Sequence, residues 1–237
     1  MMVKILLVGK HNHGKESIQG EIIKAINAVT KEDVELNSSG RTDAGVHALG
    51  QVANFKTNSK IETKKIPYAL NSKLPNSIVI KDAEEVEDRF HSRYNCKKKT
   101  YRYIINNNEF PSALNRYREF HMPIPLNFED MKKAIKYFEG THDFAGFKSS
   151  GGAPKKTTIR TIYKASIEKT SDNRIILELT GDGFLYNMVR IISGTIVDVG
   201  LGKISLKDIP KIIDSKDRKK AGKTLPPHGL YLVQVSY

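Results

Sequence analysis

The sequence predicts an α+β protein built from two ferredoxin-like (split βαβ) units with mainly antiparallel sheets. Strand-like and helix-like segments are mixed in both halves of the chain, and 237 residues exceed the usual size of one compact domain. A charged segment at residues 89–99 lacks apolar periodicity and marks the border. The predicted domains are therefore an N-terminal α/β domain, residues 1–95, and a C-terminal α/β domain, residues 96–237.

The elements of the N-terminal half follow from the spacing of its apolar residues. An apolar run at residues 4–8 predicts a buried strand. Ile18, Ile22 and Ile26 recur at helical spacing, so we expect a helix over residues 16–29. The other expected elements are strands at residues 34–38, 49–57 and 77–86, and a helix over residues 66–74 that ends before Pro75.

The C-terminal half shows the same mixture. Tyr101, Tyr103 and Ile105 alternate with other residues, which predicts a half-buried strand at residues 100–105. Asn127 is a good N-cap for a helix that Gly140 stops. The remaining expected elements are strands at residues 159–169 and 174–180, a helix in the apolar segment 184–199, and a closing strand at residues 230–237.

The chain is strongly basic. It has 39 Lys plus Arg against 26 Asp plus Glu, a formal net charge of +13. Such a charge favours a polyanionic partner, which could be RNA, DNA or an acidic membrane, although a basic excess can also serve solubility alone. Cys96 is the only cysteine, so no disulfide forms within the chain, and the apolar start is too short for a signal core or a membrane span. We expect a cytoplasmic protein with no membrane association.

One loop concentrates reactive side chains. Residues 39–48 carry a carboxylate, a guanidinium, a hydroxyl and an imidazole between glycines. A guanidinium such as that of Arg41 favours the ionised form of a neighbouring carboxylate, so Asp43 could act as a nucleophile or a base at neutral pH. On chemistry alone, an Asp in a glycine-rich turn is more often a turn former than a catalyst.

The sequence around Asp43 changes that balance. Gly40-Arg-Thr-Asp-Ala-Gly-Val-His-Ala48, followed by Gly50-Gln-Val52, resembles the signature loop of the tRNA pseudouridine synthase A family. The resemblance continues, in the family's order, at residues 99–105, 142–147, 184–194 and 229–233. It implies that the two units meet in a central sheet with a cleft, and that the protein isomerises uridine to pseudouridine in the anticodon stem-loop region of tRNA, as a homodimer without metal or cofactor.

The resemblance also implies roles for individual residues. Asp43 takes the role of the nucleophile, Tyr101 of the aromatic that stacks on the target base, and Arg190 of the basic partner of the carboxylate. Without the resemblance, Tyr101 would be a core-filling strand residue and Arg190 a solvated charge. An arginine inside an apolar helix needs a buried anion, however, because an unpaired buried charge is costly, and Asp43 is the candidate.

Several basic residues are candidates for contact with RNA. Arg41 and His47 can each either hold the loop or meet a phosphate, and of these two we count only Arg41 as a candidate. The further candidates are Lys97, Lys98 and Lys99 beside Tyr101, then Lys155, Lys156 and Arg160, and finally the cluster at residues 216–223. Each run can also be an ordinary wetted surface, and this is the more natural interpretation for the last cluster.

The N-terminal loop departs from the family pattern and leaves alternatives open. Family members carry a Trp-containing loop after the first strand, whereas this chain has no Trp and only the short run Gly9-Lys-His-Asn-His-Gly-Lys15. That run resembles a phosphate-binding P-loop, but Glu16 stands where a Ser or Thr would bind Mg²⁺. His11 and His13 lack a third ligand, so we assign no metal. A non-catalytic RNA-binding homologue is the other alternative.

Overall fold

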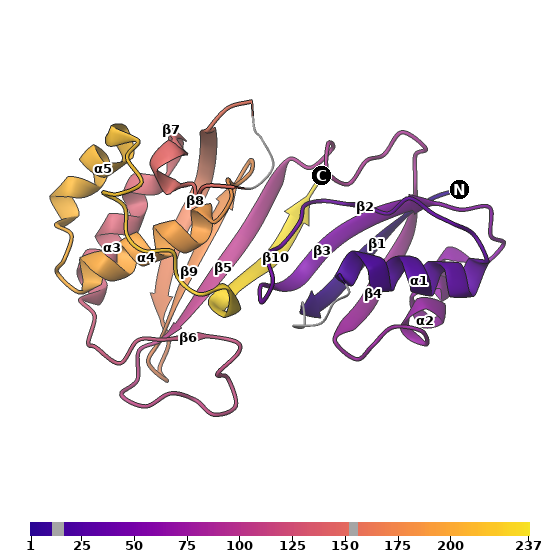
Figure 1. Ribbon diagram of the computed structural model, residues 1–237, viewed down its shortest axis with the longest axis horizontal. Coiled ribbons are helices and arrows are strands. Elements are labelled where there is room, and N and C mark those ends of the chain that lie inside the picture. The colour runs from indigo at the N-terminus through magenta and orange to yellow at the C-terminus, as the bar shows by residue number, and fades with distance from the viewer. Residues whose placement is uncertain (11–16, 152–155) are drawn as a thin grey trace. The chain divides into compact units, whose positions relative to one another are not determined.

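The computed structural model describes residues 1–10, 17–151 and 156–237. The chain is a mixed α+β protein, as predicted, and its contacts divide it into two compact units (Figure 1). The first unit consists of residues 1–97 and 231–237, and the second of residues 98–230. By its contacts, the last segment of the chain, residues 231–237, therefore belongs to the first unit, whereas the predicted division placed it in the C-terminal domain. No helix in the described part of the chain is long and apolar enough to cross a membrane.

The first unit contains a sheet with the strand order β4-β1-β3-β10. Its central strand β1 is antiparallel to both β3 and β4, and β10 is parallel to β3 with Tyr231 opposite His47. A short strand, β2, lies directly before the loop that contains Asp43 and pairs with β3. The strands are β1 Met2–Lys10, β2 Asn37–Ser38, β3 His47–Lys56, β4 Ile78–Val86 and β10 Leu230–Ser236.

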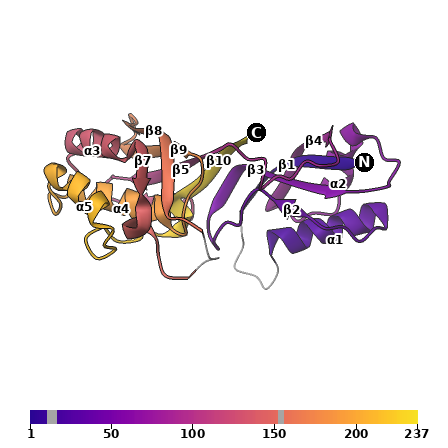
Figure 2. The ribbon, with the colours of Figure 1, turned by 90° about the horizontal axis from the view of Figure 1, so that it is seen from above.

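Two helices complete the core of the first unit. The helix α1 spans Ile18–Thr30, and α2 spans Ile66–Asn71 after a 3₁₀ turn at Thr63–Lys65. Gly20 N donates to Ser17 Oγ at 3.1 Å, which caps the start of α1. The apolar face of α1 is buried with the sheet and α2 in one cluster, and Figure 2 shows α1 along one face of that sheet. The helical spacing of the isoleucines therefore predicted α1 correctly.

The second unit has its own antiparallel sheet, in the order β5-β9-β8-β7. A short strand, β6, is parallel to the end of β5. The helices α3, α4 and α5 gather beside this sheet (Figure 2). The strands are β5 Lys98–Asn106, β6 Phe120–His121, β7 Gly140–Asp143, β8 Ile159–Lys169 and β9 Arg174–Gly181. The helices are α3 Phe128–Ala134, α4 Met188–Gly200 and α5 Ile209–Ser215, with 3₁₀ turns at Ile135–Phe138, Phe144–Phe147, Leu206–Asp208 and Pro227–Gly229.

Some expected elements are shorter in the structure. The helix capped by Asn127, whose Oδ1 accepts from Asp130 N at 3.1 Å, is α-helical only to Ala134 and then tightens into a 3₁₀ turn. The expected strand at residues 34–38 is limited to its last two residues. The apolar segment 184–199 becomes helical only at Met188, because Asn187 adopts a left-handed conformation (φ +62°) that no α-helix continues. The helix α5 was not predicted.

Candidate active site

Asp43 lies in an irregular loop that joins β2 to β3 in the first unit. Its backbone closes a tight turn, in which Val46 N donates to Asp43 O at 3.1 Å. Gly45 occupies the turn with φ +85°, a conformation that side chains rarely adopt. Asp43 is half-buried and Arg41 is exposed. The glycine therefore lets the chain turn directly after Asp43 and enter β3 with His47.

A buried glutamine holds the beginning of this loop. The Nε2 of Gln51, on β3, donates to Gly40 O at 2.8 Å. Its Oε1 accepts from Ser39 Oγ and, at 3.1 Å, from Val52 N. Ser39 N in turn donates to Val52 O at 2.8 Å. Gln51 is only 7% exposed, and because a buried amide is costly when its hydrogen bonds are missing, this clamp fixes the loop three residues before Asp43.

The other end of the loop is fixed by packing. His47 is buried, and its ring stacks on Tyr231 of β10 with 4.6 Å between the centroids and 16° between the planes. The strand β10 runs close to β3, since a Cβ on Gly50 would lie 2.3 Å from Val233 O. His47 thus packs at the base of the loop, which fits the loop-holding role among the two considered for it.

Tyr101 lies on β5 in the second unit and contacts an aromatic ring of a distant segment. The rings of Tyr101 and Phe184 meet edge to face, at 5.2 Å and 79°. Tyr101 is half-buried, whereas Tyr103, on the same face of β5, is fully buried. Tyr101 therefore packs against Phe184 and remains partly accessible to solvent.

Arg190 lies on the first turn of α4, in a cradle of neutral acceptors. Its Nε donates to Leu225 O and its Nη1 donates to Asn187 Oδ1, both at 2.6 Å. Leu225 can approach because α4 has a glycine at Gly194, where a Cβ would lie 1.9 Å from Lys223 O. The side chain of Arg190 is half-buried. Its guanidinium is therefore oriented by two elements of the second unit.

Tyr103 connects this cradle to β5. Its hydroxyl donates to Pro226 O at 2.7 Å, next to the carbonyl that Arg190 binds. Burial raises the pKa of Tyr103 far above its usual range, and the nearby charge of Arg190 lowers that pKa in part. Since Tyr101 and Tyr103 share a face of β5, the structure brings Tyr101 and Arg190 to the same face of the second unit. Asp43 belongs to the first unit, so its pairing with Arg190 stays a prediction.

The chain matches the tRNA pseudouridine synthase family over residues 6–95 and 134–237, which make up most of its length. The chain belongs to this family. A tRNA pseudouridine synthase A of Acetivibrio thermocellus is 54% identical over 222 residues, which cover 94% of this chain and 90% of that protein. One from Bacillus subtilis is 43% identical over 226 residues, which cover 94% of this chain and 91% of that protein.

Membership in the tRNA pseudouridine synthase family confirms the resemblance inferred from the motifs. It supports a pseudouridine synthase over the non-catalytic and P-loop alternatives, and the loop that suggested a P-loop and a histidine pair lies largely at residues 11–16, outside the described residues. Among solved structures, a Cbf5-Nop10-Gar1 complex matches at 12% identity with a TM-score of 0.39, covering 97% of this chain and 48% of that chain. That likeness is too weak to carry an argument.

The basic candidates of this pseudouridine synthase lie in different surroundings. Lys97 and Lys98 are exposed and Lys99 is half-buried, at the start of β5 and just before it. Lys156 is exposed, while Lys155 lies outside the described residues. Arg160 is half-buried, and its guanidinium donates to backbone carbonyls of its own segment, including Thr157 O at 3.0 Å. Two lysines of the run beside Tyr101 are thus exposed to a partner.

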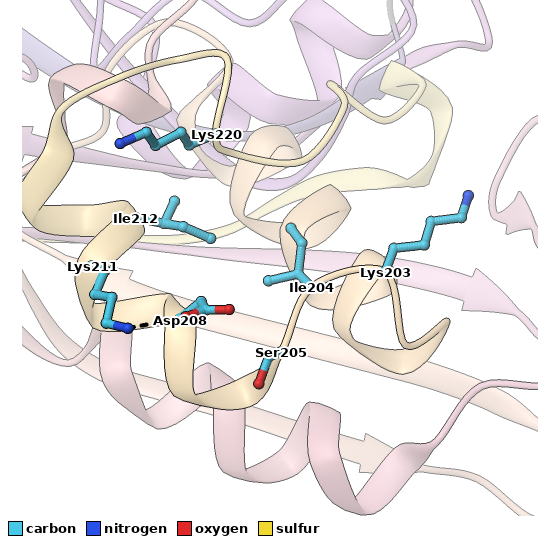
Figure 3. A pocket seen from close by; sticks show the side chains of 7 residues that line it. All are labelled: Lys203, Ile204, Ser205, Asp208, Lys211, Ile212 and Lys220. Carbon is cyan, nitrogen blue, oxygen red and sulfur yellow. Dashed lines mark hydrogen bonds and ion pairs between the residues drawn. The ribbon is translucent and has the colours of Figure 1, made fainter.

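The cluster at residues 216–223 is engaged within its own unit. Lys216 pairs with Asp143 at 3.0 Å, and the pKa of Asp143 is lowered by a hydrogen bond from Thr158 and by Lys216. Lys220 lines a pocket of about 370 Å³ with Lys203 and Lys211. Figure 3 shows the ammonium groups of Lys203 and Lys220 pointing apart, while Lys211 pairs with Asp208 at 3.4 Å. The pocket therefore does not focus positive charge on one point. This fits the interpretation of residues 216–223 as an ordinary solvent-exposed surface.

Proposed function

We propose that this protein isomerises uridine to pseudouridine in the anticodon stem-loop region of tRNA, with the carboxylate of Asp43 as the nucleophile. It acts as a homodimer in the cytoplasm, with no metal or cofactor. The observation that carries the proposal is the construction of the Asp43 loop: within a segment that matches the family, a buried clamp and a glycine turn present one half-buried carboxylate. Fixed geometry of this kind is what a nucleophile requires.

The reaction breaks the bond between N1 of uracil and C1′ of the ribose and forms a bond between C5 and C1′. The proton on C5 is removed and N1 ends protonated, so no redox change and no outside reactant are needed. The ionised Asp43 can attack C1′ or C6, or first remove a proton at C2′, and each route requires its charge. Arg190, whose cradle uses neutral acceptors, stabilises that charge.

A uridine stacked in a stem is out of reach of any side chain, so the nucleotide must leave its stack. Flipping one nucleotide costs a few kcal/mol. Stacking of the uracil on the accessible part of the Tyr101 ring offsets this cost, together with phosphate contacts from Arg41, Lys97, Lys98 and Lys99. The edge-to-face contact with Phe184 holds the Tyr101 ring in one orientation for this purpose.

The decisive experiment incubates the protein with unmodified tRNA and maps pseudouridine by chemical labelling. We expect product at the anticodon stem-loop with the natural sequence and none with Asp43→Ala, while both proteins bind tRNA. Turnover by a clean Asp43→Ala preparation would reject the assignment of the nucleophile. Binding without product from the natural sequence would instead favour the non-catalytic homologue.

A further inference from the structure

Asn187 has an unusual backbone at a position that the sequence did not single out. It is the residue before α4, with φ +62° and ψ 5°. Left-handed conformations are rare outside glycine, and Asn tolerates them better than most residues. The described part of the chain has a second such asparagine, Asn173, with φ +60° in the turn between β8 and β9. That residue offers a matched comparison.

The side-chain amide of Asn187 bridges two segments. Its Oδ1 accepts from Arg190 Nη1 at 2.6 Å, and its Nδ2 donates to Ser149 Oγ at 3.0 Å. A guanidinium can only donate hydrogen bonds, so the amide oxygen must face Arg190 and the amide nitrogen must face Ser149. Ser149 is itself tied back, because its N–H donates to Tyr186 O at 3.2 Å. The chemistry of the partners thus fixes the orientation of the amide.

Two acceptors of Arg190 differ from those of two other arginines in the same unit. Arg102 and Arg174 bind the carboxylates of Glu178 and Glu119, at 2.6 Å in each case. In the cradle of Arg190, the amide of Asn187 and the carbonyl of Leu225 hold two edges of the planar guanidinium without adding a negative charge. These two hydrogen bonds orient the guanidinium from the side of Leu225 and from the side of Asn187.

We propose that Asn187 is a positioning residue for Arg190, and that Ser149 acts through Asn187 by locking the amide. The inference rests on the proposed function, in which Arg190 stabilises the carboxylate of Asp43. Asn187 does not touch the reacting atoms; it sets the angle at which the guanidinium is presented. The competing explanation is that Asn187 only shapes the chain at the start of α4, in which case its amide is irrelevant to turnover.

The test compares Asn187→Gly with Asn173→Gly. Glycine accepts a positive φ at both sites, so both variants keep their backbone. Loss of one hydrogen bond to a charged group predicts that Asn187→Gly lowers kcat roughly 10- to 100-fold, with the KM for tRNA close to that of the natural sequence and a fall in unfolding temperature similar to that of Asn173→Gly. Asn173→Gly loses its own side-chain bond, to Asn107 O at 2.5 Å, and should keep kcat.

Ser149→Ala tests the side-chain bridge of Asn187 without changing the backbone at residue 187. It removes the partner of Nδ2 and should lower kcat by less than Asn187→Gly does. In the double variant, the loss of Ser149 should add nothing, because Ser149 acts only through the amide.

Three outcomes would overturn the inference: an unchanged kcat in Asn187→Gly, a fall in kcat that follows lost stability, or additive effects in the double variant. If Asn187→Gly does not fold, an unchanged kcat in Ser149→Ala is itself sufficient to overturn it. If the natural sequence makes no pseudouridine at all, the proposed function fails, and this inference fails with it. If the natural sequence is active and Asn187→Gly has a normal kcat, only the inference fails and the proposed function stands.

Discussion

The two units hold their candidate catalytic residues in opposite ways. In the first unit, Asp43 lies in a loop without regular structure, and the clamp by Gln51 fixes the backbone rather than the carboxylate. In the second unit, Arg190 lies on a helix whose backbone is already fixed, and the cradle binds the side chain itself. An irregular loop needs a clamp because it lacks a hydrogen-bond ladder of its own, whereas a long side chain on a helix needs its rotamer restricted.

The largest effect is expected where the charge itself is removed. Asp43→Asn keeps the shape of the side chain and the turn formed by Asp43 O, but the amide is no nucleophile at neutral pH. Pseudouridine formation should fall to background while tRNA affinity and thermal stability hold. Asp214→Asn, an exposed site on α5, is the matched control and should be fully active. A measurable burst of product from Asp43→Asn would contradict the role of the charge.

A smaller but still large effect is expected from the clamp. Gln51→Glu keeps the oxygen that accepts from Ser39 and Val52 but replaces the donor to Gly40 O with a second acceptor. A buried carbonyl left without its donor costs roughly 1–3 kcal/mol, so the denaturant midpoint should fall together with kcat.

The exposed Gln234, on β10, provides the control Gln234→Glu, which should change neither quantity. The comparison between the units is sharpened if kcat and stability fall together in Gln51→Glu, while kcat in Asn187→Gly falls by more than its loss of stability explains. Equal loss of stability in both variants would show that the two units do not differ in this respect.

Tyr103→Phe tests the outer support of the Arg190 cradle. The change removes the hydrogen bond to Pro226 O, at a cost of about 1 kcal/mol in unfolding free energy, and should reduce kcat only a few-fold because Leu225 still accepts from Arg190.

The variant also has a pH signature. Burial raises the pKa of Tyr103, so the folded state keeps the phenol proton that the unfolded state loses near pH 10, and stability must fall as pH rises above about 10. Alkaline denaturation followed by circular dichroism should show a shallower loss in Tyr103→Phe. An identical slope in both proteins would mean that Tyr103 titrates freely in the fold.

The contrast between the units also explains how much the sequence could predict. Apolar spacing predicted α1, β1 and the strand that carries Tyr101, because burial on one face leaves a period in the sequence. The motif match indicated the loop of Asp43 and the segment of Arg190. The partners that hold them were missed: Gln51 lay inside a quoted motif and Asn187 inside another, but no period or spacing shows that an amide bridges residues 149 and 190.

Contacts between residues far apart in the chain produce even less signal in the sequence. The approach of Leu225 to Arg190 depends on a glycine on α4 that the apolar pattern cannot distinguish from a neutral core residue. The left-handed residue before α4 likewise shortened a helix that hydrophobicity alone extended to residue 184. Such features depend on which chain segments meet, and a single sequence does not state this.

The smallest effect is expected at Arg41, which shares its residue type with Arg190 but not its surroundings. Arg41 is exposed, so a phosphate is the partner that suits it, and Arg41→Gln should weaken tRNA binding a few-fold without changing kcat. Loss of one phosphate contact should also reduce the slope of log affinity against log salt by roughly 0.7–0.9.

Replacing each arginine with lysine compares the two sites directly. The ammonium of a lysine binds a phosphate nearly as well as a planar guanidinium does, so Arg41→Lys should bind tRNA as the natural sequence does. In contrast, Arg190→Lys cannot span Leu225 O and Asn187 Oδ1 and should lose turnover. A fall in kcat in Arg41→Lys would show instead that the loop, like the cradle, depends on the planar geometry of a guanidinium.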